Sequence, residues 1–130
     1  MFFILHVLLM VTATLGFIAG VIVAMFFRKN GTWLKSHKTL NSFSLVGIAG
    51  GIIMAFIYVA DSSGKHIDGF HQINGLAAFI IASCTMFAGF YQFKAKNKSA
   101  VRAAHRWLGR ISLLMFLTAI ILGLLLINII

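Results

Sequence analysis

Four of the five histidines recur at nearly constant intervals, and histidine is a common axial ligand of haem iron. His6, His37, His71 and His105 are separated by 31, 34 and 34 residues, whereas His66 falls outside the series. Each of the four lies near the start of a long apolar segment. Ionisable residues inside membrane-spanning segments are rare and are functional by default. The spacing therefore makes these histidines candidates for binding haem iron in pairs, although a single histidine near a membrane interface is often only an amphipathic surface residue.

The composition is that of an integral membrane protein. The chain has 130 residues, of which 61% are hydrophobic and 10% charged, whereas soluble proteins are typically about a quarter charged. A transmembrane helix needs about 20 mostly apolar residues, and we read the first segment as a retained span because no basic residue precedes it, unlike a signal peptide. The sequence predicts an all-α fold: a single integral membrane domain, 1–130, forming a transmembrane antiparallel four-helix bundle with spans at about 2–27, 39–60, 70–93 and 107–130.

The few charged residues indicate how the spans are oriented. Ten of the eleven Lys and Arg residues lie in or beside the first and third connections, whereas both acidic residues, Asp61 and Asp68, lie with Lys65 in the second. The positive-inside rule places the basic connections in the cytoplasm, so both termini are predicted to be extracytoplasmic. The net charge of +9 is then explained by orientation in the lipid bilayer, and a nucleic-acid partner is not expected. A multi-pass protein of the plasma membrane is predicted.

This orientation sorts the four histidines into two pairs. His6 and His71 are predicted near the outer face on the first and third spans, and His37 and His105 near the inner face on the second and fourth. In a bundle wound in sequence order these spans are diagonal, so each pair can approach one cofactor in the bundle core. His66 is predicted to be solvated in the outer loop, with replacement of His71 as a ligand as its alternative.

Glycines stand at matched distances from the histidines. A glycine fourteen or eighteen residues after a histidine lies about 21 or 27 Å along the helix, where it would leave room for the flat macrocycle bound near the other face. The alternative is close helix–helix contact through small residues. The glycines assigned to the site are Gly16, Gly20, Gly47, Gly51, Gly89 and Gly123.

Basic residues near the inner face are candidates to pair with anionic haem propionates. These candidates are Arg106, Arg110 and Lys38. The lone Cys84 is predicted to be a small core residue, and the sequence has no C-x-x-C-H motif, so covalent haem attachment is not indicated.

The pattern of one histidine per span, together with the segment His105-Arg106-Trp107-Leu108-Gly109-Arg110, resembles the four-helix core of the cytochrome b561 superfamily. The resemblance covers nearly the whole chain. It implies two non-covalent b-type haems, with His6 and His71 as ligands of the outer haem and His37 and His105 as ligands of the inner haem. Many members of that superfamily have six spans whereas four are predicted here, so the electron donor and acceptor do not follow from the resemblance.

Three functional hypotheses follow. The first is a di-haem cytochrome that carries electrons across the membrane, with an extracytoplasmic cytochrome or reductase as redox partner and quinone as a further candidate. The second is a haem-bearing subunit of a larger quinone-linked oxidoreductase, and the third is a haem-free membrane scaffold. A homodimer or larger complex is compatible with the first two. The sequence contains no acid–base or nucleophilic constellation, so whether the protein is an enzyme stays open.

Overall fold

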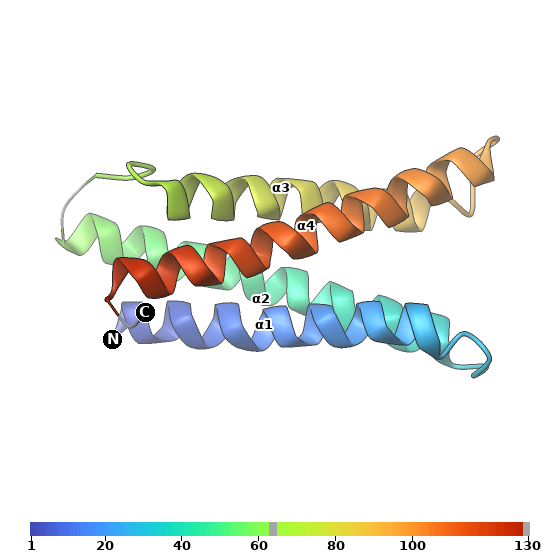
Figure 1. Ribbon diagram of the computed structural model, residues 1–130, viewed down its shortest axis with the longest axis horizontal. Coiled ribbons are helices and arrows are strands. Elements are labelled where there is room, and N and C mark those ends of the chain that lie inside the picture. The colour runs from blue at the N-terminus through green and yellow to red at the C-terminus, as the bar shows by residue number, and fades with distance from the viewer. Residues whose placement is uncertain (63–64, 129–130) are drawn as a thin grey trace. The chain divides into compact units, whose positions relative to one another are not determined.

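The structure is a computed structural model that describes residues 1–62 and 65–128, which form α-helices joined by short connections without any strand. The all-α fold class predicted from the sequence is confirmed. The four helices, drawn in Figure 1, are α1 (Phe2–Phe26), α2 (Trp33–Ser62), α3 (Phe70–Tyr91) and α4 (Lys98–Leu126).

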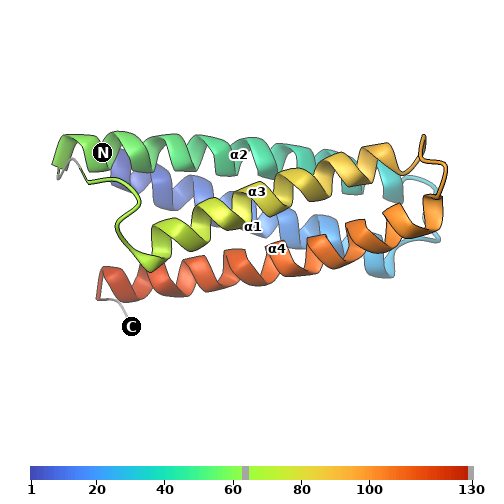
Figure 2. The ribbon, with the colours of Figure 1, turned by 90° about the horizontal axis from the view of Figure 1, so that it is seen from above.

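The chain divides into two compact units, each a pair of packed helices. Unit 1, Met1–His66, contains α1 and α2, and unit 2, Ile67–Ile130, contains α3 and α4. Helices within a unit are antiparallel and lie side by side along their length (Figures 1 and 2). Each unit is therefore a helical hairpin whose short connection keeps its two helices in contact.

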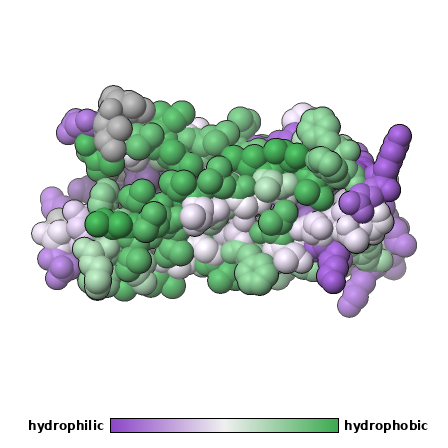
Figure 3. Space-filling view, turned by 90° about the horizontal axis from the view of Figure 1, so that it is seen from below, coloured by the Kyte–Doolittle hydropathy of each residue, from purple (hydrophilic) through white to green (hydrophobic). Residues whose placement is uncertain are grey.

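All four helices are long and apolar enough to cross a membrane. The shortest, α3, has 22 residues and is about 33 Å long, which exceeds the roughly 30 Å of a bilayer's hydrocarbon core. Figure 3 shows apolar side chains over the middle of the helices on one face, with hydrophilic side chains gathered near the helix ends. The protein is a multi-pass integral membrane protein.

Two helices begin earlier than the predicted spans. We expected spans from about residue 39 and from about residue 107, but α2 begins at Trp33 and α4 begins at Lys98. The basic residues between those points lie on helices and not in loops, because a helix can continue past the apolar core as an amphipathic end. Asn97 fixes the start of α4, since its side chain accepts a hydrogen bond from the backbone N–H of Ala100 at 3.1 Å, an N-cap arrangement.

Small residues allow close packing of α1 against α2. A methyl group added at Gly47 would lie 3.0 Å from the Cβ atom of Ala13, and one added at Gly16 would lie 2.6 Å from Ser44 Oγ. Ala13 and Ser44 are both buried. In a membrane, helices associate through such close packing and not through the hydrophobic effect, so these glycines position the two helices of unit 1.

Candidate functional site

In unit 1 each histidine is bonded to the backbone of the neighbouring helix. His6 on α1 places Nδ1 2.8 Å from the carbonyl oxygen of Gly51 on α2. His37 on α2 places Nδ1 2.8 Å from the carbonyl oxygen of Gly20 on α1. The two contacts are reciprocal, because each helix supplies one histidine and one carbonyl acceptor.

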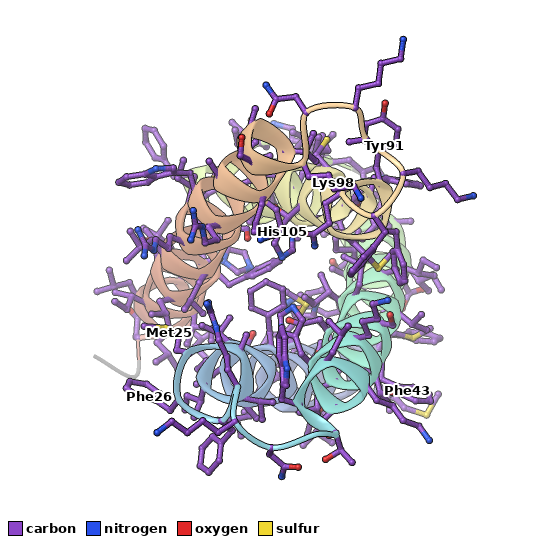
Figure 4. The ribbon with its side chains drawn as sticks, turned by 90° about the vertical axis from the view of Figure 1, so that its right-hand side faces the viewer. Met25, Phe26, Phe43, Tyr91, Lys98 and His105 are labelled. Carbon is purple, nitrogen blue, oxygen red and sulfur yellow. The ribbon has the colours of Figure 1, made fainter. Side chains whose placement is uncertain are left out.

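Unit 2 repeats this arrangement with different acceptor residues. His71 on α3 places Nδ1 2.9 Å from the carbonyl oxygen of Ala119 on α4. His105 on α4 places Nδ1 2.8 Å from the carbonyl oxygen of Thr85 on α3. In Figure 4 the labelled His105 lies on the side of α4 that faces α3, in agreement with this contact.

These contacts determine which imidazole nitrogen carries the proton. A carbonyl oxygen can only accept a hydrogen bond, so Nδ1 is the donor in all four cases. In a neutral imidazole the lone pair is then on Nε2. Histidines that bind metals are commonly held in this way, with the distal N–H bonded to a carbonyl that fixes the tautomer and the ring orientation. All four side chains therefore have the tautomer that ligation of iron through Nε2 requires.

His37 also lies close to the side-chain amide of Asn41, which follows it by one helical turn. Nδ2 of Asn41 lies 3.1 Å from His37 Nδ1 and also donates to the backbone carbonyl of His37 at 2.7 Å. Nδ1 cannot both donate to Gly20 and accept from Asn41. We assign the proton to Nδ1, because the other three histidines show the same carbonyl contact. The side-chain N–H group of Asn41 then lies beside the Nδ1–H group of His37, and both groups are donors.

One rule of spacing describes all four contacts. Each histidine bonds to the carbonyl of the residue fourteen positions after the other histidine of its hairpin. Sequence reasoning assigned Gly20 and Gly51 to the site as space for a macrocycle, but it missed Thr85 and Ala119 and the carbonyl role of all four. The constant offset of fourteen was the signal that could have identified them.

The same offset separates the two histidines of a hairpin. In unit 1, His37 lies beside Gly20, which is fourteen residues, or about 21 Å, along α1 from His6. In unit 2, His105 lies beside Thr85, about 21 Å along α3 from His71. Two histidines so far apart cannot bind the same iron. Each hairpin therefore offers one ligand at each of two depths.

Two of the glycines lie directly against the imidazole rings. A methyl group added at Gly89 would lie 2.8 Å from Cε1 of His105, and one added at Gly123 would lie 3.0 Å from Cε1 of His71. Gly16, Gly20, Gly47 and Gly51 instead face side chains of the partner helix within unit 1. This geometry supports the alternative of close helix contact for those four, and space for a macrocycle stays a prediction.

The basic candidates are placed at or near helix surfaces. Arg106 and Arg110 are exposed, and Lys38 is half-buried. The guanidinium carbon of Arg110 lies 5.2 Å from the centre of the Trp107 ring, a cation–π geometry. The structure thus places Arg110 with an aromatic residue typical of membrane interfaces, and propionate binding stays a prediction for all three.

Two further expectations concern reactive side chains outside the four histidines. Cys84 was predicted to be a core residue, but it is exposed on α3, so this prediction was wrong. His66 is exposed, as expected, and its ring stacks on Phe56 with centroids 5.0 Å apart.

The donor set suits haem better than a bare metal ion. In the part of the chain that the structure describes, no group of three or more His, Cys, Asp or Glu side chains is placed to hold a metal ion. Haem supplies four of the six iron ligands itself, so it requires only one or two histidines from the protein. Each hairpin offers two imidazoles, about 21 Å apart along the helix, and so could supply one ligand to each of two haems.

Four helices that are long and apolar enough to cross a membrane, each with one histidine bonded to a backbone carbonyl, are compatible with a haem protein of the membrane. The family model described as eukaryotic cytochrome b561 matches residues 1–129. The chain belongs to the cytochrome b561 family, whose members are transmembrane haem b electron-transfer proteins. Comparison with curated proteins and with solved structures gave no match.

Proposed function

We propose that this protein transfers electrons across a membrane between two haem b groups, each bound by one histidine from each hairpin. His6 and His71 bind the outer haem, and His37 and His105 bind the inner haem. The observation that carries this proposal is the fourfold Nδ1–carbonyl contact, which prepares Nε2 of every histidine as a ligand. The separation of about 21 Å within a hairpin requires the second ligand of each iron to come from outside that hairpin.

The haem groups supply reversible one-electron chemistry, and the protein supplies position and electrostatics. The four carbonyl contacts hold each imidazole in one orientation. The ligands therefore need to move little when the charge of the haem iron changes. The missing side chains of Gly89 and Gly123 leave room for the rings of His105 and His71 close to the neighbouring helix. The apolar helix surfaces keep water from the centre of the membrane segments.

Haem stoichiometry in single-histidine variants tests the proposal. Purified protein should show a sharp b-type α-band in its reduced-minus-oxidised spectrum and two haems per chain. We expect His6→Ala and His71→Ala to lose the same haem, and His37→Ala and His105→Ala to lose the other. Absence of haem from purified protein would support the scaffold hypothesis. If His6→Ala and His37→Ala lost the same haem, the pairing would be wrong.

We further propose that electrons enter and leave at the helix ends through partner molecules. At the predicted cytoplasmic end, the exposed residues Lys94, Lys96 and Lys98 surround the α3–α4 connection, and Figure 4 shows Lys98 and Tyr91 at this end of unit 2. The partners would be a cytochrome or reductase on the extracytoplasmic side, with quinone as a further candidate. The membrane would be the plasma membrane, and the assembly a homodimer or a larger complex. Co-purification of a cytochrome or reductase with the tagged chain would support this; haem reduction by quinol without any partner protein would contradict the need for one.

A further inference from the structure

The four histidines differ in the residue that lies one helical turn after each of them. These four residues are Met10, Asn41, Gly75 and Gly109. Two have no side chain and Met10 has no N–H group, so only Asn41 brings a hydrogen-bond donor to its histidine. The shared carbonyl contact makes the four ligands alike, and Asn41 makes one of them different.

Packing holds the Asn41 amide against His37. The amide occupies the space left by the missing side chain of Gly20: a methyl group there would come within 2.9 Å of Asn41 Cγ. Nδ2 is anchored by its 2.7 Å bond to the His37 carbonyl and lies 3.1 Å from Nδ1. The amide is thus fixed on both sides, with its positive end toward the ring.

The equivalent place in the other half of unit 1 is filled by a thioether. Met10 follows His6 by one turn, and a methyl group added at Gly51 would lie 2.8 Å from Met10 Sδ. Met10 and Asn41 therefore occupy matching positions. Each lies beside the glycine of the neighbouring helix whose carbonyl accepts a hydrogen bond from the histidine of its own helix. This gives the chain a built-in comparison between a polar and an apolar neighbour.

The sign of the electrostatic effect follows from the charge of the iron. Oxidation adds one positive charge to the haem and its ligands, and a positive dipole end nearby opposes that change. Second-shell hydrogen bonding is among the means by which proteins set haem potentials. We propose that Asn41 is a positioning residue that raises the reduction potential of the haem bound by His37 relative to the haem bound by His6. This inference rests on the proposed function, because it requires both haems.

Equilibrium redox titration in single-haem backgrounds tests the inference. With His6→Ala, the remaining haem reports the His37 site, and we compare Asn41 with Asn41→Leu, which has nearly the same shape and no dipole. In Asn41→Leu we expect the ferrous-to-ferric ratio of this haem, at a fixed ambient potential, to fall by about three- to tenfold. A tenfold change corresponds to about 59 mV for a one-electron couple. The matched variant is Met10→Asn in the His37→Ala background, where the ratio should rise by a similar factor.

A second substitution separates tuning from packing. Hydroxyls at Thr12, Ser62 and Ser83 donate to the carbonyl four residues earlier. A serine in Asn41→Ser can therefore keep the hydrogen bond to the His37 carbonyl, but it has no amide N–H group beside the His37 ring. We expect Asn41→Ser to lower the potential as Asn41→Leu does, and if Asn41→Leu fails to bind haem, Asn41→Ser and Met10→Asn decide. Unchanged potentials in haem-loaded variants would overturn the inference. So would an equal shift of the His6 haem when Asn41→Leu is placed in the His37→Ala background. A wild-type protein without haem would instead overturn the proposed function.

Discussion

A histidine that donates through Nδ1 to a main-chain carbonyl is held by a group that no side-chain substitution removes. The acceptor residues are Gly20, Gly51, Thr85 and Ala119, which share small size and little else. Small side chains at these positions allow the ring to approach the neighbouring backbone. Binding of the imidazoles is therefore most sensitive to substitutions that add volume beside the ring.

Gly89 and Gly123 are the positions where added volume should matter most. A Cβ atom at Gly89 would lie 2.8 Å from His105 Cε1, and the ring can move away only by weakening its bond to Thr85. We expect Gly89→Ala to lower affinity for the His105 haem by roughly 10- to 100-fold, the usual effect of losing an outer-shell partner, and Gly123→Ala to do the same for the His71 haem. Titration of apo-protein with haem measures this.

Gly75 provides the control for those two variants. It lies on α3 one turn after His71, and a Cβ atom there would meet nothing within 4 Å. Gly75→Ala should therefore bind both haems with unchanged affinity. A loss in Gly75→Ala as large as that in Gly89→Ala would show that the effect comes from the helices generally and not from contact with the imidazole.

Much of the site is present in the sequence, and what is missing has a physical reason. The histidine spacing predicts four ligand candidates, and within each hairpin the two histidines lie about 21 Å apart along the helix; their binding of haem stays a prediction. The carbonyl acceptors are backbone atoms, and Thr85 and Ala119 carry no side-chain signal of their role. Asn41 was missed because its importance depends on the absence of a side chain at Gly20, on another helix. Cys84 was misplaced because an apolar run in a membrane protein does not distinguish core from lipid-facing positions.

At the scale of the helices, the predicted number and order were correct and two starting points were not. Hydropathy measures the part of a helix that matches the bilayer, and the helices α2 and α4 continue beyond it into basic residues. Their first turns contain no acidic residue. The helix dipole favours anions and disfavours cations at a helix N-terminus, so it does not explain why Lys98 and its basic neighbours lie there. Orientation relative to the membrane accounts better for this arrangement.

Packing of α1 on α2 gives a prediction about stability. The Cβ atom of Ala13 is attached to the backbone, so Gly47→Ala, which brings two Cβ atoms to 3.0 Å, must move the helices apart. Overpacking typically costs about 1–3 kcal/mol, against a gain of about 1 kcal/mol from helix propensity. We expect Gly47→Ala to unfold at a lower temperature than wild type in detergent, as measured by circular dichroism.

Gly50 is the matched position on the same helix. A Cβ atom there would lie 3.6 Å from Leu9 Cδ1, an ordinary van der Waals distance. Gly50→Ala should keep the propensity gain of up to about 1 kcal/mol and unfold at the same temperature as wild type or higher. The packing explanation fails if Gly47→Ala proves at least as stable as Gly50→Ala.

At the scale of the whole molecule, the orientation in the membrane is a prediction from charge. In a Cys84→Ser background, a single cysteine at Ser99, beside the start of α4, should react with a membrane-impermeant maleimide only after the cells are opened. A cysteine at Asp68, before α3, should react in intact cells. The reverse pattern would invert the assignment of inner and outer haems while leaving the hairpin geometry unchanged.

The reciprocal contacts have a consequence for direction. The histidine contacts are the same at both ends of a hairpin, because each histidine contacts the other helix fourteen residues after that helix's own histidine. These contacts by themselves therefore favour neither direction of electron transfer. If the proposed function holds, a preference of the electron for one haem must come from features that differ between the two ends of a hairpin. These are the amide of Asn41 as against the thioether of Met10 in unit 1, and the basic residues in and beside the connection within each hairpin.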